Sequence, residues 1–193
     1  MIKAIETTYK GYRFRSRVEA RWAVFFDTLD IRWEYEKEGF DLGIAGPYLP
    51  DFWLPDLDLW VEIKGQDPTP NECKKAEALC RMTDATVAIF SGSPWFNIAR
   101  AYYFKYVDEE TGISEVADTG WWYPGAEKDG YDYEKEDGEG CYYQGWHTWG
   151  IGEVSGKPEI ICLVDRDDVR AAQLVGHAYS AARSARFEHG ETP

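Results

Sequence analysis

Two carboxylates and a lysine lie within a short stretch of this chain. They are Asp51, Glu62 and Lys64, and the last two are separated by one residue. Successive side chains of a β-strand point to opposite faces, so Glu62 and Lys64 share a face if residues 58–64 form a strand. Carboxylates can hold a hard divalent cation, and a lysine beside them can act on a water molecule or a phosphate. These residue types in this order are typical of metal-dependent phosphodiester hydrolysis.

Two antiparallel strands are predicted to carry these residues. Prolines bound residues 48–54, and residues 58–64 alternate apolar and polar side chains. With a loop at 55–58, Asp51 falls opposite Glu62, where paired Cβ atoms lie roughly 4.5–5.5 Å apart. Two carboxylates at that distance repel each other unless a cation lies between them, so Mg²⁺ or Mn²⁺ is the expected cofactor.

The expected metal ligands are the carboxylates of Asp51 and Glu62 and the backbone carbonyl of Ile63. Lys64 would hold or deprotonate the attacking water, or offset the charge that develops on the phosphate. Asp56 competes with Asp51 for the metal. We favour Asp51 because Asp56 falls in the turn, where an aspartate is favoured for the bond that its side chain makes to nearby backbone.

An amphipathic helix is predicted upstream, over residues 16–29. Apolar side chains at 18, 22, 25, 26 and 29 follow the spacing of one helical face. Glu19 lies at the edge of this face, where it could reach the metal directly or through water. It also forms a capping-box pattern with Ser16, and the spacing gives the two roles about equal weight.

The order of these features resembles the PD-(D/E)XK nuclease superfamily. The resemblance rests on a helix with Glu19, a short strand near residues 31–35, and strands with Pro50-Asp51 and Glu62-Ile63-Lys64, and it covers residues 9–91. Within this superfamily, the chain resembles small phage-encoded endonucleases related to Holliday-junction resolvases and to endonuclease subunits of Tn7-type transposases. The resemblance implies catalytic roles for Asp51, Glu62 and Lys64, a helix acid at Glu19 and an auxiliary role for Gln66. For Gln66, the role of an ordinary polar residue in a turn is favoured over this auxiliary role.

A helix over 68–84 and a strand over 86–90 follow the predicted hairpin. The order αβββαβ predicts an α/β (α+β) fold with a mixed central sheet flanked by helices, and the resemblance implies a restriction-endonuclease-like core. We expect a nuclease core over residues 1–94 and an aromatic, acidic, β-rich insertion over 95–160, in which 102–107 is a strand candidate. A C-terminal strand (160–164) and helix (166–187) complete the chain, and residues 161–193 are expected to pack on the core.

Charge is distributed unevenly along the chain. The net charge is −14, and residues 108–139 hold twelve acids and two lysines, so they alone carry −10. Residues 1–35 hold seven basic and five acidic residues and carry +2. A negative chain repels DNA, but this distribution places the candidate site outside the acidic stretch. Candidate phosphate contacts are Arg13, Arg15, Arg17, Gln66, Lys74, Lys75, Arg183 and Arg186.

Arg13, Arg15 and Arg17 alternate with other residues before the helix, so an extended segment would line their guanidinium groups on one side, near the metal. Solvated surface charge is the alternative for these three. For Arg183 and Arg186, favourable placement at the end of a helix is a sufficient alternative.

These features predict a metal-dependent endonuclease that hydrolyses DNA, with branched or specific DNA as candidate substrates. Two alternatives stay open. One is a non-cleaving nucleic-acid-binding protein on the same fold. The other is an acidic protein-interaction or DNA-mimicking module that acts through residues 108–149. The expected partners are DNA and either a second copy or another protein, bound through the aromatic and acidic region, where core or interface packing is the favoured role of the aromatic residues.

The chain has no run of eighteen apolar residues and no apolar leader after Met1. A cytoplasmic location without membrane contact is therefore expected, in the host cytoplasm if the protein is phage-encoded. The four cysteines are scattered, which argues against a zinc site and predicts reduced, buried thiols.

Overall fold

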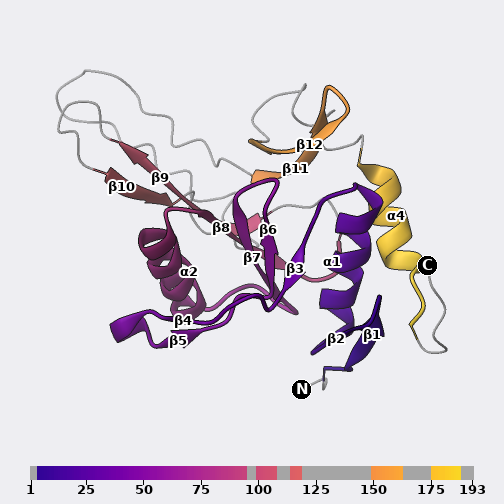
Figure 1. Ribbon diagram of the computed structural model, residues 1–193, viewed down its shortest axis with the longest axis horizontal. Helices are drawn as coiled ribbons and strands as arrows, with labels where there is room; N and C mark the ends of the chain where they lie inside the picture. Colours follow the sequence, from indigo (N-terminus) through magenta and orange to yellow (C-terminus); the bar gives the residue numbers. More distant parts are fainter. Residues whose placement is uncertain (1–3, 95–98, 108–113, 119–148, 163–174, 188–193) are drawn as a thin grey trace, which may run out of the picture.

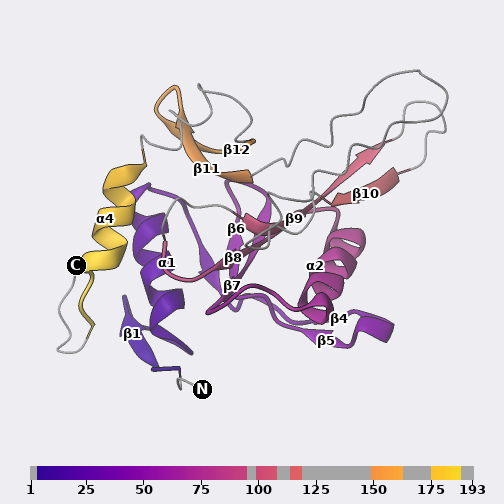
Figure 2. The same cartoon turned by 180° about the vertical axis from the view of Figure 1, so that it is seen from behind.

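The computed structural model describes residues 4–94, 99–107, 114–118, 149–162 and 175–187. In these parts the chain forms a mixed α and β fold around a six-stranded sheet. Helices α1 (Arg17–Thr28) and α4 (Gly176–Ser184) lie on one side of the sheet, and α2 (Pro70–Thr83) lies on the other (Figures 1 and 2). The predicted α+β class, with a mixed sheet flanked by helices, is confirmed.

The sheet has the strand order β10-β9-β8-β7-β6-β3. Its central pair, β7 (Leu59–Lys64) and β8 (Thr86–Ser91), is parallel, since α2 returns the chain to the end where β7 began. The antiparallel pairs add β3 (Glu34–Tyr35), β6 (Phe52–Leu54), β9 (Ala99–Val107) and β10 (Ser114–Asp118). The sheet thus continues into the segment expected to form the aromatic and acidic insertion, and β9 contains the predicted strand at 102–107.

Helix α1 forms where the apolar spacing predicts it. Ser16 caps its N-terminus through its side chain. Trp22, Phe25 and Phe26 are almost completely buried, in a cluster that includes Phe52 of β6. Burying an apolar side chain of this size stabilises the fold by about 1.5–3 kcal/mol. These aromatic residues therefore fix α1 on its face of the sheet.

Helix α2 begins with a capping box. The Thr69 hydroxyl accepts the N–H of Glu72, and the Glu72 carboxylate accepts the N–H of Thr69 at 2.7 Å. Pro70 occupies the first position, where a missing N–H leaves no helical bond unmade. The helix ends at Asp84, which has a left-handed φ of +62°. Its buried side packs on the face of β7 that carries Trp60.

Helix α4 packs on α1. The ring of Tyr179 stacks on Phe25 with 5.2 Å between ring centroids, and Ala178 and Ala182 are fully buried. The two helices run in opposite directions, so the start of α1 and the end of α4 lie at the same end of the molecule (Figure 1). The helix predicted from residue 166 is described only from Gly176 onward, because residues 163–174 lie outside the described parts.

Among the described residues, three two-stranded hairpins surround this core. β1 (Thr7–Tyr9) and β2 (Tyr12–Phe14) precede α1. β4 (Phe40–Asp41) and β5 (Pro47–Tyr48) are joined through the 3₁₀ helix η1 (Gly43–Ala45) and lie beside α2 (Figure 1). β11 (Trp149–Val154) pairs with β12 (Lys157–Cys162), which overlaps the predicted strand at 160–164.

The structure corrects two details of the predicted hairpin. Residues 48–54 do not form one strand, since Tyr48 pairs within the β4–β5 hairpin and only Phe52–Leu54 pairs with β7. β7 is buried on both faces instead of one. The reason is that α1 packs on one face and α2 on the other, as is usual for strands in a parallel arrangement.

None of the helices in the described parts is long and apolar enough to cross a membrane. Cys73 and Cys80 on α2 are buried, reduced thiols, as predicted, and burial raises the pKa of Cys80 to about 11. Cys141 lies outside the described residues.

Candidate functional site

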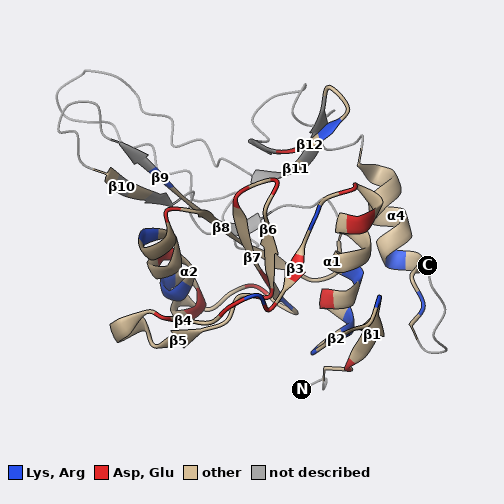
Figure 3. Ribbon diagram, in the orientation of Figure 1, with Lys and Arg blue, Asp and Glu red and all other residues tan. Residues whose placement is uncertain are grey.

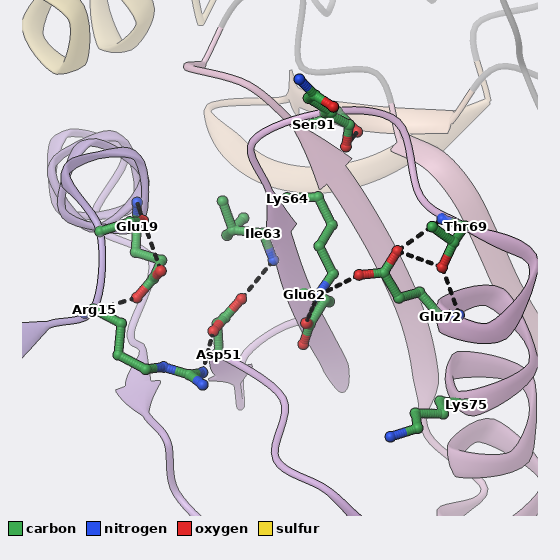
Figure 4. A network of polar contacts seen from close by, with 12 residues as sticks. Arg15, Glu19, Asp51, Glu62, Ile63, Lys64, Thr69, Glu72, Lys75 and Ser91 are labelled. Carbon is green, nitrogen blue, oxygen red and sulfur yellow. Dashed lines mark hydrogen bonds and ion pairs between the residues drawn. The ribbon is translucent and has the colours of Figure 1, made fainter. Parts of the chain in front are cut away.

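Asp51, directly before β6, lies beside Glu62 of β7, as predicted. Phe52 pairs with Val61, so Asp51, one residue earlier, continues the register opposite Glu62. Both carboxylates are buried, with only 3% and 6% of the residue surface exposed. One oxygen of Asp51, Oδ2, accepts the backbone N–H of Ile63 at 2.7 Å (Figure 4). The hairpin geometry therefore fixes the Asp51 carboxylate against β7.

Both acids are in surroundings that disfavour their charged forms. Burial raises the pKa of Asp51 well above its usual range, and the negative charges of Glu62 and Glu19 raise it further, against the opposing effect of a backbone amide and Arg15. Burial also raises the pKa of Glu62, although Lys64 opposes this shift. A cation between the two carboxylates would favour their charged forms and remove their repulsion.

Lys64 lies between two carboxylates. Its Nζ is 2.5 Å from Oε1 of Glu62 and 3.0 Å from Oε1 of Glu72, the acid that completes the capping box of α2 (Figure 4). Burial alone would lower the pKa of Lys64, but the charges and hydrogen bonds of these carboxylates outweigh burial and raise it. Lys64 is therefore held in position as a protonated cation, which suits it to offset negative charge.

Arg15 contacts the acid that is predicted to bind the metal. Its Nη2 lies 2.7 Å from Oδ1 of Asp51, and its Nε lies 2.7 Å from Oε1 of Glu36. Burial would lower the pKa of Arg15, but hydrogen bonding to Tyr35 and the charges of the two acids raise it. The guanidinium group thus compensates the buried charge of Asp51 in this structure.

Glu19 takes part in the cap of α1. Its Oε1 accepts the Ser16 hydroxyl at 2.6 Å, and its Oε2 accepts the Tyr35 hydroxyl at 2.6 Å and the backbone N–H of Arg15 at 3.1 Å. Glu19 thus helps to cap α1, but its carboxylate bonds to the Ser16 hydroxyl and the Arg15 N–H and not to the Ser16 N–H, so the predicted capping box is formed only in part. Asp51 lies between Glu19 and the strand that carries Glu62 (Figure 4), so the charge of Glu19 still acts on Asp51.

The residues present fit a hard divalent cation with few protein ligands. Oε2 of Glu62 is buried and makes no hydrogen bond to any described residue. The N–H of Ile63 points at Asp51, and in an extended strand the carbonyl of a residue points to the same side as its N–H. Within the described residues no group of three or more His, Cys, Asp or Glu side chains is arranged around a metal position. Mg²⁺ needs no such group, because it binds through one or two carboxylates and keeps several waters.

The competing acid Asp56 is occupied elsewhere. It forms an exposed ion pair with Arg32, and hydrogen bonding to Arg32 lowers the pKa of Asp56. It lies in the turn between β6 and β7, away from the Asp51 end of the hairpin. This placement favours Asp51 as the candidate ligand.

The alternation of Arg13, Arg15 and Arg17 predicts that they line one side of the chain, and this prediction is wrong. β2 ends at Phe14 and α1 begins at Arg17, so the extended geometry is interrupted. Arg13 forms an exposed ion pair with Glu6, whereas Arg15 contacts Asp51. Arg17 instead lines a groove with Arg183 and Arg186, two further predicted phosphate contacts.

The other predicted contacts are dispersed over the loop after β7 and the start of α2. Gln66 and Lys74 are exposed. Lys75 donates from Nζ to the carbonyl of Pro47 at 2.9 Å, which ties α2 to β5. None of the contacts described for these three side chains is with Asp51 or Glu62.

Sequence reasoning missed several neighbours of the site. The Tyr48 hydroxyl is buried, and burial together with the charges of Glu62 and Asp51 raises its pKa well above the usual range. Tyr35 and Glu36 are near the site because of the path that the chain takes after α1, and no sequence motif indicated this path. Only Glu72 had a visible signal, since Thr69-x-x-Glu72 is a capping box, but nothing showed that its second oxygen would hold a lysine.

Comparisons with known proteins add no relative: no protein-family model, no curated protein and no solved structure matches this chain.

Proposed function

We propose that this protein is a Mg²⁺- or Mn²⁺-dependent endonuclease that hydrolyses DNA phosphodiester bonds by a PD-(D/E)XK mechanism. The observation that carries the proposal is the pairing of Asp51 and Glu62. Two buried carboxylates with raised pKa values are opposite each other on paired strands, and a protonated lysine is in contact with one of them. Such an arrangement is unfavourable without a cation, and it has the donor types that Mg²⁺ prefers.

The order of elements also supports the proposal. In chain order, α1, β3, β6, β7, α2 and β8 give αβββαβ, with the β4–β5 hairpin inserted between β3 and β6. We infer that this unit is a restriction-endonuclease-like core. The acids lie where the β6–β7 hairpin passes between the helical layers, so one side of the site is formed by α1 and the other by α2 (Figure 4).

Asp51, Glu62 and the Ile63 carbonyl would hold the metal, which supplies a Lewis acid for the phosphate and lowers the pKa of a bound water. Lys64 is held by Glu62 and Glu72 and offsets the negative charge that grows on the phosphate oxygens. Arg15 compensates Asp51 from the side opposite β7. Water adds to phosphorus, one P–O ester bond breaks, and the displaced sugar oxygen leaves with a proton.

A non-cleaving nucleic-acid-binding protein is a second candidate, and one observation favours it. The charged groups of the site already satisfy one another, since Arg15 pairs with Asp51, Lys64 pairs with Glu62 and Glu72, and Glu19 is bonded to the cap of α1. Such ion pairs offset part of the buried negative charge without a metal. This candidate predicts DNA binding without metal-dependent cleavage.

Plasmid cleavage separates these candidates. Supercoiled plasmid is incubated with the purified protein in Mg²⁺, Mn²⁺ or EDTA, beside the variants Asp51→Asn and Lys64→Ala. The proposal predicts nicked or linear DNA with either metal and none in EDTA, and a loss of at least about 100-fold in both variants. Asp56→Asn is the matched control and should cut as the wild type does, because Asp56 is engaged with Arg32.

Cleavage that survives in Asp51→Asn would exclude these carboxylates as the catalytic site. Binding of DNA by the wild type without any cleavage would favour the non-cleaving candidate. The ratio of nicked to linear product shows whether one strand is cut at a time.

A further inference from the structure

Four arginines from distant parts of the sequence line one groove. The groove lies between the first turns of α1 and the end of α4, and has a volume of about 390 Å³. The described residues that line it are Arg17, Arg21, Arg183, Ser184, Ala185, Arg186 and Phe187. Figure 3 shows basic residues on the start of α1 and the end of α4, which lie side by side in both cartoon views. No carboxylate occurs among the described lining residues.

This concentration of positive charge is unusual in a chain with a net charge of −14. Four guanidinium groups around one groove create a positive potential there, which attracts an anion. The planar guanidinium fork matches the geometry of phosphate oxygens, and its charge persists at any physiological pH. The chemistry of the groove is therefore that of a phosphate-binding site.

The side chain of Arg21 is held in place at the groove. Its Nη1 donates to the Ser93 hydroxyl at 3.0 Å, just after the end of β8. Its Nε is buried and has no hydrogen-bond partner among the described residues. An unsatisfied buried donor costs about 1–3 kcal/mol, so an acceptor supplied by a ligand would offset this penalty.

The groove is connected to the candidate active site through the residues that follow β8. The Trp22 indole donates to the carbonyl of Gly92 at 2.9 Å, and the N–H of Gly92 donates to the carbonyl of Lys64 at 2.7 Å. Ser93, the partner of Arg21, is the next residue along the chain. The arginine groove and the end of β7 that carries Lys64 are thus fixed relative to each other by α1 and this short loop.

We propose that the groove of Arg17, Arg21, Arg183 and Arg186 binds a backbone phosphate of the DNA strand, at a position other than the phosphate that is cut. This inference rests on the proposed function, because it assigns the substrate's path from the candidate active site across the start of α1 and the end of α4. Contacts of arginine to phosphate position the DNA and do not read its sequence.

Equilibrium binding tests the groove independently of cleavage. A short fluorescein-labelled duplex is titrated with the protein in EDTA and in Ca²⁺, over a series of salt concentrations, by fluorescence anisotropy. The test variant is Arg21→Gln/Arg186→Gln. The matched control, Arg32→Gln/Arg81→Gln, loses the same charge from exposed ion pairs elsewhere. Circular dichroism and the thermal midpoint show that both variants fold, and Arg21→Lys/Arg186→Lys keeps the charge in the groove.

We expect the groove variant to bind about tenfold more weakly at 0.1 M salt, with a slope of log K against log[salt] that is less steep by about one for each phosphate that the protein no longer neutralises. The control and the lysine variant should keep a slope within about half a unit of the wild type. Equal reductions of affinity in the groove variant and the control would overturn the proposal, because they would reflect net charge alone. A wild type that does not bind duplex would also overturn it.

A free phosphate ion is the other source of the same chemistry. To test for it, the thermal midpoints of the wild type and the groove variant are measured in inorganic phosphate and in chloride at equal ionic strength. If inorganic phosphate stabilises the wild type but not the groove variant, and DNA affinity is unchanged, the groove binds a small anion and the DNA contact is rejected. Failure of the groove leaves plasmid cleavage and its loss in Asp51→Asn unaffected, so the two proposals fail separately.

Discussion

At the scale of single residues, the two buried acids oppose folding while they are ionised. Burial and mutual repulsion raise the pKa of Asp51 and, through burial, that of Glu62. A carboxyl group with a raised pKa in the folded state binds more protons folded than unfolded. Its stabilising contribution is present in full below the unfolded pKa and is lost as the pH rises through the folded pKa. The two acids therefore favour a cation increasingly as the pH rises.

Removing the charge of Asp51 should stabilise the metal-free protein. In EDTA at pH 8, we expect Asp51→Asn to raise the thermal midpoint, by about 2–4 °C for each kcal/mol gained, and to reduce the fall in stability between pH 5 and pH 8. The check is thermal unfolding at a series of pH values. Asp56→Asn is the control, since its pKa is lowered and its neutralisation should not raise the midpoint. A lower midpoint for Asp51→Asn would show that its ion pair with Arg15 outweighs burial.

Divalent cations should favour the wild type over Asp51→Asn in thermal stability. Mg²⁺ or Mn²⁺ should raise the thermal midpoint of the wild type and leave that of Asp51→Asn unchanged, because a ligand that binds only the folded state stabilises it. Calcium can serve as a non-hydrolysing comparison. Equal shifts in both proteins would place the cation somewhere other than between Asp51 and Glu62.

At the scale of elements, the N-terminus of α2 links helix formation to the site. One oxygen of Glu72 closes the capping box with Thr69, and the other contacts Lys64. Bonds from the Thr69 N–H and hydroxyl and from Lys64 lower the pKa of Glu72, although burial acts in the opposite sense. The helix therefore holds a charged acid at a fixed position beside the lysine.

Two substitutions separate the cap from the positioning of Lys64. Thr69→Ala should reduce the free energy of unfolding by about 1 kcal/mol and leave cleavage nearly unchanged, because the Glu72 carboxylate remains. Glu72→Gln should lower kcat by about 10- to 100-fold with little change in KM, as the loss of partners that orient a catalytic group does. Chemical denaturation and plasmid kinetics measure the two effects. Equal activity loss in both variants would mean that Glu72 acts only through the helix.

The packing of α1 between the sheet and α4 is the element contact on which the groove depends. Phe25 is fully buried and stacks on Tyr179 of α4. Phe25→Ala should lower the free energy of unfolding by about 3–5 kcal/mol, as measured by chemical denaturation. Ile44→Ala, at a fully exposed position in η1, should change it by less than about 0.5 kcal/mol.

At the scale of the whole molecule, charge is segregated. The acidic stretch 108–139 carries −10, while four arginines gather at the α1–α4 groove. Long-range repulsion from the acidic stretch should slow the approach of DNA, most strongly at low salt.

Neutralising acids in this stretch tests whether it is the working surface. Replacing the acids of residues 127–139 by their amides should increase DNA affinity at low salt, with a smaller effect at high salt. The protein-interaction alternative predicts instead that activity disappears with these charges while Asp51→Asn has no effect. Anisotropy titrations at two salt concentrations, with plasmid cleavage alongside, measure both outcomes.

The local elements and the juxtaposition of the two acids could be predicted from the amino-acid sequence. Periodicity located α1 and α2, and the turn at residues 55–58 set a register that placed Asp51 opposite Glu62. These features depend on side chains close in sequence, for which alternation and capping are sufficient signals. The same local reasoning was wrong about the alternation of Arg13, Arg15 and Arg17, because the start of a helix interrupts the strand geometry.

The residues that surround that pair depend on how the layers of the fold pack. Arg15 reaches both Asp51 and Glu36, and Glu72 reaches Lys64. The end of α4 and the residues after it bring Arg183 and Arg186 to α1 from the far end of the sequence. Helices on both sides of the sheet bury β7 from Leu59 to Ile63, and these contacts form between the resulting layers. A polar group that is buried by this packing either finds a hydrogen-bond partner or stays unsatisfied, as Nε of Arg21 does among the described residues. Packing between layers of the fold leaves no periodic signal in the sequence.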